Sequence, residues 1–276
     1  MAISSPNPTV VPVSTTTPLV VARVPYLNCA PFFAGLELGP GWSWAEVPPR
    51  QFGAQAAEGR VIAGPMSLVD YLRLQDQFER LRPLGIATRG HCGSALLFSC
   101  KPVRQLDGAT IGVTDETSTS ALLLRLILEQ RYQLSPKVYQ RWTTRELTAH
   151  SMEVDAVLLI GDEALRFRAA NRWYPYELDL GFEWWIWQHR PTVFAVWAIR
   201  KDAEPAQKQF ISRAIQHQLA LNLSRLDEVA ASRADAVGMS AKDVKAYLES
   251  FIYRFSAPEE EAIVEFTRLL DAHRLR

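Results

Sequence analysis

The chain has 276 residues, with 30 basic and 30 acidic side chains, so its formal net charge is zero. This balance gives no electrostatic basis for binding nucleic acid or an anionic membrane surface. Hydrophobic residues make up 48% of the chain, yet no apolar run reaches the ~20 residues that a membrane-spanning helix requires. Length and composition predict a globular protein large enough to form two lobes.

The cysteines and the N-terminal residues indicate the cellular compartment in which the protein is expected. The three cysteines, Cys29, Cys92 and Cys100, form no Cys-x-x-Cys pair, which favours a reducing environment over a disulfide framework. Residues 1–18 are rich in Pro, Ser and Thr and carry no charge, so they lack the ordered regions of a secretory signal. We therefore expect residues 1–18 to be a flexible N-terminal extension of a cytoplasmic protein.

The first part of the chain alternates strands and helices. In chain order the expected elements are a strand at 19–24, a helix at 30–38, a strand at 42–47, a helix at 51–58, a strand at 61–63, a helix from 67 to about 74, and strands at 84–88 and 95–99. This order favours a parallel sheet with helices on both faces.

The alternation resumes after Pro102. The expected elements are strands at 111–113, 137–140, 155–160 and 193–199, an extended segment at 174–180, and helices at 121–132, 143–150, 163–167 and 184–187. From residue 204 onward the pattern is helical almost to the end. Two alternating blocks predict two α/β lobes with a cleft between them.

A polar turn, TDETSTS at 114–120, joins the strand at 111–113 to the helix that follows. Such a turn presents free backbone N–H groups and the positive end of a helix dipole, which together attract an anion. Alternatively, Thr117 or Ser118 simply caps the helix. Similar junctions at 25–30, 64–67 and 161–162 favour a ligand site. We expect the acidic Asp115 and Glu116 to point away from any bound anion or to cap backbone N–H groups.

Junctions at the carboxyl ends of parallel strands meet at one edge of a sheet, where open sheets bind ligands. The polar side chains predicted to line this cleft suit a small polyoxygenated anion; they are Asn28, Ser67, Ser94, Thr117, Ser118, Thr119, Ser120 and Asp162.

The common catalytic and metal-binding motifs are absent from the sequence. It contains no His-Glu-x-x-His, no phosphate loop, no Gly-x-Gly-x-x-Gly after a strand and no Gly-x-Ser-x-Gly elbow. Cys29 and Cys92 have no recognisable partner for nucleophilic catalysis, and His91 in a glycine-rich loop is a candidate base or a surface residue. The residues alone predict a two-lobed anion-binding protein and no defined chemistry.

Six motifs carry a family resemblance in the same order along the chain: YLNCAPF (26–32), GPMSLVDYL (64–72), GSALLFS (93–99), TSTSALLL (117–124), LLIGDEAL (158–165) and FAVWAIR (194–200). The chain resembles the chorismate dehydratases of the futalosine route to menaquinone. The resemblance implies an α/β, two-lobed type-II periplasmic-binding-protein-like fold, each lobe a mixed, mostly parallel sheet flanked by helices. It implies one lobe from 19–102 and 200–276, another from 103–199, and crossovers near 99–107 and 198–202.

The activity implied is that of a hydro-lyase, converting chorismate to 3-[(1-carboxyvinyl)oxy]benzoate and water without a cofactor, a metal or an obligate protein partner. Asn28 and Ser94 match the family's catalytic positions. The substrate-binding residues implied are Ser67, Thr117, Ser118, Thr119, Ser120, Gly161 and Asp162. One departure from the family pattern is Arg190, which replaces an apolar residue before FAVW and is either a new carboxylate contact or a surface variation.

Two other functions remain open at this point. The first is a non-catalytic solute-binding protein of the same fold for a small carboxylate, although the absence of a recognisable secretion signal counts against it. The second is a cytoplasmic ligand-sensing domain, but no basic patch or DNA-binding module accompanies it.

Overall fold

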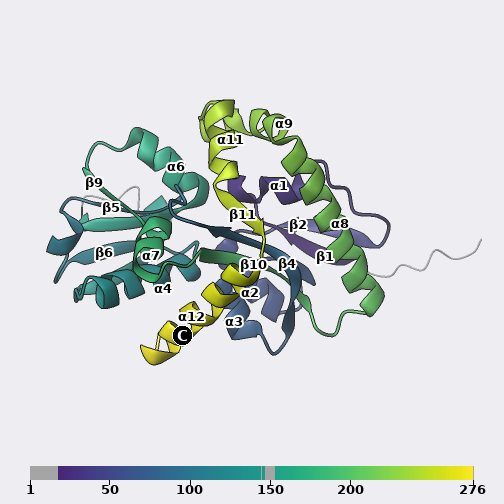
Figure 1. Ribbon diagram of the computed structural model, residues 1–276, viewed down its shortest axis with the longest axis horizontal. Helices are drawn as coiled ribbons and strands as arrows, with labels where there is room; N and C mark the ends of the chain where they lie inside the picture. The colour runs from purple at the N-terminus through teal and green to yellow at the C-terminus, as the bar shows by residue number, and fades with distance from the viewer. Residues whose placement is uncertain (1–17, 144, 147–152, 276) are drawn as a thin grey trace, which may run out of the picture.

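The computed structural model describes residues 18–143, 145–146 and 153–275, and it places two sheets side by side (Figure 1). The extension predicted at residues 1–18 lies, apart from residue 18, outside the described part. So does most of the helix predicted at 143–150.

The first sheet has the strand order β11-β4-β10-β3-β1-β2. Its strands are β1 (Leu19–Arg23), β2 (Trp42–Glu46), β3 (Ala63–Ser67), β4 (Phe78–Thr88), β10 (Thr192–Arg200) and β11 (Phe251–Arg254). The pairs β1–β2 and β1–β3 are parallel, whereas β10 pairs antiparallel with both β3 and β4, and β11 pairs antiparallel with β4.

The second sheet has the order β7-β6-β8-β5-β9. Its strands are β5 (Ala95–Ser99), β6 (Thr110–Thr114), β7 (Val138–Trp142), β8 (Ala156–Ile160) and β9 (Tyr176–Asp179). Here β6 pairs parallel with β7 and β8, and β5 pairs antiparallel with β8 and β9. The two-lobed α/β architecture with mixed sheets is confirmed, but the parallel character is confined to β1–β2–β3 and β6–β7–β8.

Helices cover both faces of each sheet, as the alternation predicted. The helical segments are η1 (Leu27–Cys29), α1 (Ala30–Phe33), α2 (Pro49–Ala57), α3 (Leu68–Leu74), η2 (Val103–Gln105), α4 (Thr119–Arg125), η3 (Leu126–Arg131), α6 (Gly161–Ala170), α7 (Leu180–Gln188), α8 (Pro205–Ser224), α9 (Leu226–Ala231), α10 (Ala234–Val237), α11 (Ala241–Glu249) and α12 (Ala257–Ala272). Neighbouring strand residues feed opposite faces: on β1, Val21 packs with Ile211 and other α8 residues, and Ala22 packs with Phe52 of α2.

The chain changes sheets at residues 89–94, between β4 and β5, and returns at 189–191, between α7 and β10. The lobe boundaries predicted at residues 102 and 200 therefore fall later in the chain than these crossings. The turn signal at Lys101-Pro102 marks the end of β5, and such a signal does not reveal the sheet to which the strand belongs.

Several elements have other bounds than the sequence predicted, and two segments differ in type. Residues 64–67, predicted as a turn, form most of β3, because this stretch lies between β1 and β10 and bonds to both neighbours. Residues 251–254, predicted to lie in a helical region, form the edge strand β11. Its alternating burial, with Phe251 and Tyr253 buried, fits a strand that packs by one face.

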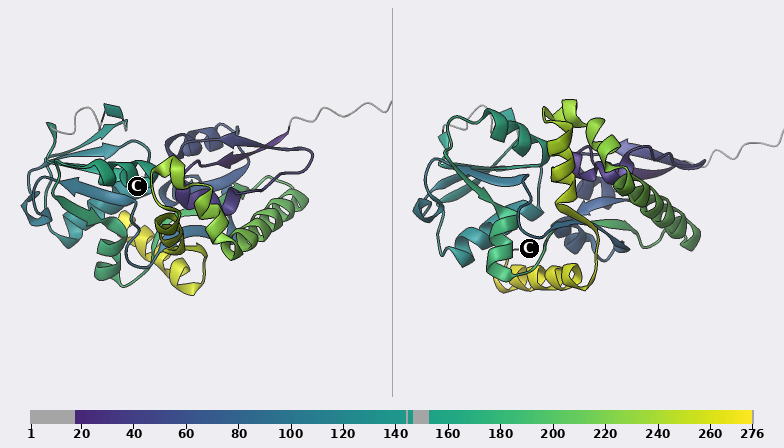
Figure 2. Two further views of the ribbon diagram at one scale, coloured as in Figure 1. Left: turned by 90° about the horizontal axis from the view of Figure 1, so that it is seen from above. Right: turned by 45° about the horizontal axis from the view of Figure 1, so that its top comes forward.

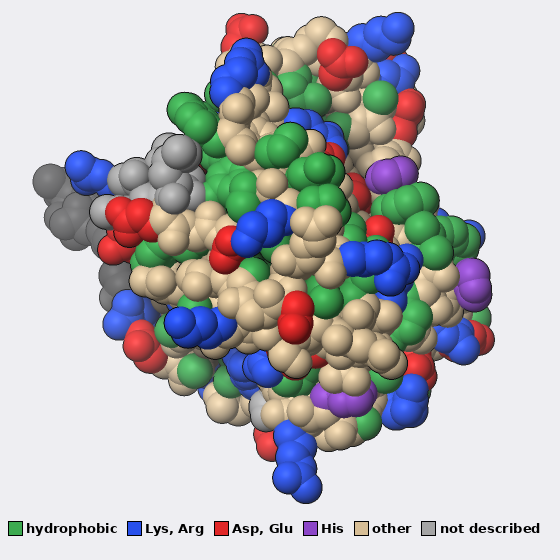
Figure 3. Space-filling view, turned by 90° about the vertical axis from the view of Figure 1, so that its left-hand side faces the viewer, with side chains coloured by type: hydrophobic (Ala, Val, Ile, Leu, Met, Phe, Trp, Pro, Cys, Tyr) green, Lys and Arg blue, Asp and Glu red, His purple; other side chains and the backbone are tan. Residues whose placement is uncertain are grey.

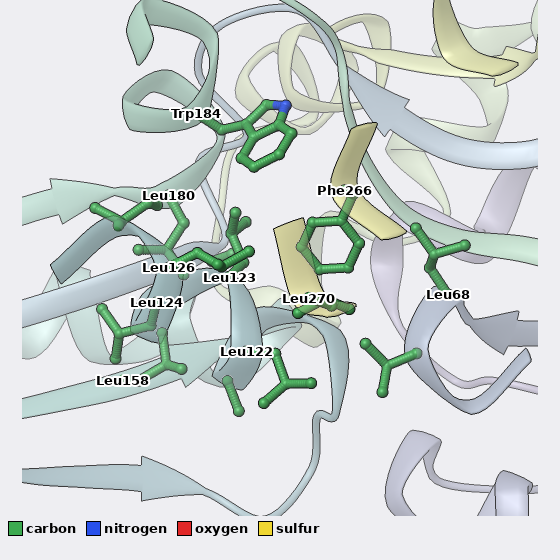
Figure 4. Close-up of a cluster of buried hydrophobic side chains, with 14 of the residues drawn as sticks. Leu68, Leu122, Leu123, Leu124, Leu126, Leu158, Leu180, Trp184, Phe266 and Leu270 are labelled. Atoms are coloured by element: carbon green, nitrogen blue, oxygen red, sulfur yellow. The ribbon is translucent and has the colours of Figure 1, made fainter. Parts of the chain in front are cut away.

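A shared apolar cluster connects the lobes. It contains Leu68 from the first lobe, Leu123 and Trp184 from the second, and Phe266 and Leu270 from α12, which converge in Figure 4. The rings of Trp184 and Phe266 meet edge to face with centroids 5.6 Å apart. Helix α12 thus packs beneath both crossings, and two further views show it running across the junction (Figure 2).

Three consecutive glutamates at the start of α12 each pair with an arginine. The pairs are Glu259–Arg89 at 3.0 Å, Glu260–Arg80 at 2.7 Å and Glu261–Arg190 at 2.7 Å. Arg89 adjoins the first crossing and Arg190 the second, so the helix is anchored to both. Arg190, the departure from the family pattern, is therefore engaged at the surface, with 39% of its side chain exposed.

Charge is dispersed on the face of the second lobe turned away from the first. Lys and Arg alternate there with Asp and Glu (Figure 3). Within the described residues no helix has both the length and the apolar character to cross a bilayer.

Replacing Glu260 tests the pair that anchors α12 to β4, since Arg80 lies on that strand. Arg80 is only 7% exposed and donates two hydrogen bonds of 2.7 Å to Glu260, so Glu260→Ala leaves a buried guanidinium without its acceptors. We expect a loss of about 1–3 kcal/mol in the free energy of unfolding by urea. Glu265→Ala, which removes a pair with the exposed Arg268, is the control and should change nothing measurable. Equal losses in both variants would contradict the anchor.

Candidate functional site

A cavity that is partly open to solvent lies between the lobes. It is bounded by the start of the first lobe, the first crossing, the start of α4, the end of β8 and β10. Its lining residues are Val24, Tyr26, Asn28, Cys29, Pro49, Pro65, Ser67, Ile86, Cys92, Ser94, Ala95, Thr117, Thr119, Ser120, Ile160, Gly161, Phe194, Ala195 and Phe251.

Asn28 reaches the cavity from η1, directly after β1. The turn is held from the other lobe, because the carboxylate of Asp162 accepts the N–H of Leu27 at 2.8 Å. Among the described residues the Asn28 side chain hydrogen-bonds only with the Cys29 thiol, which donates to its amide oxygen at 3.5 Å. Its amide N–H groups therefore remain available to a ligand.

Ser94 lies at the end of the first crossing, and Asp179 fixes the backbone before it. The Asp179 carboxylate accepts the N–H groups of Cys92 at 3.1 Å and Gly93 at 2.7 Å, and it also caps α7 through Phe182. A carboxylate with this many donors is a rigid support. It sets the position of Ser94 at the cavity wall.

The Ser94 hydroxyl also meets Tyr247, a residue that the sequence analysis missed. Ser94 Oγ and Tyr247 Oη are 2.7 Å apart, and both residues are buried. Tyr247 belongs to α11 and shares its apolar face with Val244 and Leu248, so its spacing indicated only a core position. No local signal in the sequence connects it to a residue 153 positions earlier.

The hydroxyls of the 117–120 turn serve two purposes. Thr117 Oγ1 accepts the N–H of Ser120 at 3.1 Å, so Thr117 caps the helix and lines the cavity at once. Thr119 Oγ1 accepts the N–H of Val69 at 3.1 Å and thereby joins α4 to α3 of the other lobe. The Ser120 hydroxyl lines the cavity without a partner among the described residues, which makes it a free contact for a ligand.

Ser67 occupies the end of β3 and the cap of α3. Its hydroxyl accepts the N–H of Asp70 at 3.2 Å and donates to the Asp70 carboxylate at 2.8 Å. Ser67 therefore caps α3, and it lines the cavity as expected.

Two predicted binding residues do not line the cavity. Ser118 is the N-cap residue of α4 and is half-buried, and it lies outside the cavity lining. Asp162 lies in the first turn of α6 and supports Leu27 from behind the wall. Because a carboxylate inside the cavity would repel an anion, this placement suits an anionic ligand better than the predicted one.

Tyr26 and Gly161 form the seam where the lobes meet. Gly161 has φ of +56°, and a Cβ on it would lie 2.7 Å from the Tyr26 ring. The Tyr26 hydroxyl donates to Glu116 of the second lobe at 3.4 Å. Glu116 is thus turned to Tyr26 and does not line the cavity, in line with the expectation for this acid.

The cavity wall is electrically neutral among the residues that line it. Burial raises the pKa of the Cys29 and Cys92 thiols, and nearby Asp162 and Asp179 raise it further, so both stay protonated. Neither is a nucleophile in this state. His91 is 69% exposed and stacks on Phe182, outside the wall. No group of His, Cys, Asp and Glu among the described residues could hold a metal ion.

Comparison of the sequence with known proteins identifies relatives along nearly the whole chain. Residues 19–272 match the family described as "Menaquinone biosynthesis". The chain is 29% identical over 267 residues to the chorismate dehydratase of Thermus thermophilus, covering 92% of this chain and 95% of that protein.

Solved structures resemble the fold at lower identity. Protein AF1704 from Archaeoglobus fulgidus aligns with a TM-score of 0.76 at 19% identity, covering 94% of this chain and 98% of that one. The periplasmic aliphatic sulphonate binding protein SsuA from Escherichia coli aligns with a TM-score of 0.58 at 16% identity, covering 85% and 82%. The Candida albicans CA3427 gene product, described as having the generic periplasmic binding protein fold, aligns with a TM-score of 0.59 at 12% identity, covering 95% and 91%. The predicted periplasmic-binding-protein-like fold is confirmed.

Adding one methyl group at Gly161 tests the seam. Gly161→Ala places a Cβ against the Tyr26 ring in a left-handed backbone, whereas Gly108→Ala has φ of +65° and no atom within 4 Å of the new Cβ. We expect Gly108→Ala to lower the free energy of unfolding by about 1–2 kcal/mol through backbone strain. Gly161→Ala should lower it by roughly 1–3 kcal/mol more because of the clash. Equal losses, measured by urea unfolding, would show that the seam is loose.

Proposed function

The chain belongs to the menaquinone biosynthesis family, and from that membership we propose that it is a chorismate dehydratase. In this proposal it converts chorismate to 3-[(1-carboxyvinyl)oxy]benzoate and water, as a cofactor-independent hydro-lyase of the futalosine route in the cytoplasm. The observation that carries the proposal is the convergence of Asn28 and Ser94 on one neutral cavity in a relative of a chorismate dehydratase.

The reaction does not require a strongly acidic or basic group from the protein. The proton lost sits on the ring carbon that carries the enolpyruvyl ether, and its departure sends charge through the ring double bond into the ring carboxylate. Loss of the neighbouring hydroxyl then gives a benzene ring. The elimination of water is redox-neutral overall, so no oxidant or reductant is needed. The gain in aromaticity drives the step. The protein has to orient the diacid and stabilise developing charge.

The cavity offers hydrogen-bond donors on several sides for that task. Asn28 extends from the first lobe and Ser94 from the first crossing. Thr119 and Ser120 add hydroxyls at the start of α4, whereas the Ser67 hydroxyl, which also lines the cavity, already donates to Asp70. We assign Asn28 and Ser94 to the reacting centre and the hydroxyls of Thr119 and Ser120 to the carboxylates.

The proton acceptor in this scheme is the side-chain carboxylate of the substrate itself. The thiols of Cys29 and Cys92 are held protonated by burial. The carboxylates nearest the seam, Glu116 and Asp162, bond to Tyr26 and Leu27 and lie outside the cavity lining. When the substrate's own carboxylate takes the proton, no ionisable protein group has to reach the reacting carbon. Binding of the substrate also orients this carboxylate.

Incubation of the purified protein with chorismate, without added cofactor, tests the proposal directly. We expect a product lighter by one water, detected by mass spectrometry, with the ultraviolet absorption of a substituted benzoate. Binding of chorismate without product would favour the alternative, a non-catalytic solute-binding protein for a small carboxylate. If the protein shows neither binding of chorismate nor product, chorismate is excluded as the ligand.

The assignment of Asn28 and Ser94 predicts a specific kinetic pattern. Asn28→Ala and Ser94→Ala should each lower kcat by about 10²–10³, since each removes a donor that stabilises developing charge. KM should change by less than about fivefold, because the carboxylate contacts remain. Ser118→Ala is the matched control, as Ser118 neighbours the turn without lining the cavity, and it should keep near-normal kcat. Near-normal kcat in both Asn28→Ala and Ser94→Ala would refute the assignment.

A further inference from the structure

The contact between Ser94 and Tyr247 links the cavity wall to the C-terminal part of the chain. The two oxygens are 2.7 Å apart, and Ser94 and Tyr247 are 5% and 8% exposed. Tyr247 is absent from the cavity lining, so it reaches a ligand only through Ser94. Its ring is held in place by Phe251, edge to face with centroids 5.1 Å apart, and it packs 3.6 Å from the position of a Cβ on Gly93.

The direction of this hydrogen bond follows from what each hydroxyl has nearby. Within the described part of the chain, Tyr247 Oη bonds only to Ser94 Oγ. Burial raises the pKa of Tyr247 well above its ordinary value, so the phenol keeps its proton, and a buried O–H requires an acceptor. The Tyr247 proton therefore points at Ser94 Oγ.

The proton of Ser94 is then left for the cavity. Its other nearby acceptor is the Cys92 carbonyl at 3.5 Å, which is too long for a strong bond. A hydroxyl that already accepts a hydrogen bond becomes a better donor, since each bond in a chain polarises the next. It also becomes a poorer base, because a lone pair is occupied.

We propose that Tyr247 is a positioning residue that fixes the Ser94 hydroxyl as a hydrogen-bond donor toward the substrate. This inference rests on the proposed dehydration and gives Ser94 one role in it. Ser94 donates to the leaving hydroxyl or to the oxygen on which charge develops, and it does not take the substrate proton. The interaction joins the first crossing to α11, so the donor is oriented only when these two segments lie together.

Removal of the phenolic oxygen tests the role in kinetics. In Tyr247→Phe the Ser94 hydroxyl loses its orienting partner, and we expect kcat to fall about tenfold with KM changed by less than about threefold. In the Ser94→Ala background the same substitution should have no further effect on kcat, because it acts through Ser94. Ser94→Thr, which keeps a hydroxyl for Tyr247 to bond, should retain more activity than Ser94→Ala.

Tyr253→Phe is the matched control. Tyr253 lies on the neighbouring strand, is 3% exposed, and its hydroxyl has no hydrogen-bond partner among the described residues. Loss of that hydroxyl should leave kcat unchanged. An equal drop in kcat for Tyr253→Phe and Tyr247→Phe would show a general packing effect and overturn the inference.

A stability measurement keeps the inference testable if Tyr247→Phe folds poorly. Ser94→Ala leaves the buried phenol without an acceptor, so its Tm should lie below that of the double variant Ser94→Ala/Tyr247→Phe. A double variant with a lower Tm than Ser94→Ala would show that the two hydroxyls are not coupled. Product from the wild-type protein with unchanged kcat in Tyr247→Phe would overturn the role of Tyr247 alone, whereas no product from the wild-type protein would overturn the proposed function as well.

Discussion

The cavity depends on a hydrogen bond between main chain and side chain across the two lobes, from the N–H of Leu27 to the carboxylate of Asp162. It joins the turn after the first strand of one lobe to the first helix after β8 of the other. Tyr26 to Glu116 and Val69 to Thr119 cross the same boundary. Because each contact draws one partner from each lobe, the wall that holds Asn28 is complete only when the lobes are together. A complete cavity therefore requires association of the two lobes.

Acidic side chains around the cavity are used as supports, and the wall itself is made of neutral groups. Asp179 holds the backbone before Ser94, and Asp162 holds the backbone before Asn28. Burial raises the pKa of Asp162, while the bond from Leu27 opposes that change. Each carboxylate accepts backbone N–H groups from the far side of the wall. The negative charge is thus kept behind the residues that line the cavity, where its repulsion of an anionic ligand would be weaker than at contact distance.

Much of the fold followed from the sequence, because long apolar runs such as residues 156–160 and clear breaks such as Pro102 carry local signals. The strand at 251–254 was missed because four residues between helices give too little periodicity, and only pairing with β4 makes them a strand. The lobe boundaries were misplaced because turn residues mark where a strand ends and carry no information about its neighbours. At the site, Asn28 and Ser94 were identified from sequence motifs. Tyr247 and the supporting role of Asp162 were identified only from contacts between distant segments of the structure. Such contacts leave no trace in local sequence.

The helix α12 limits how ligands come and go. Trp184 and Phe266 are buried where this helix meets the second lobe, and Leu68 is buried toward the first. Exposing two such aromatic side chains to water requires about 3–6 kcal/mol, so a widely parted form would be populated on the order of one per cent or less. A small ligand would then enter the cavity through its partly open side, without a wide separation of the lobes.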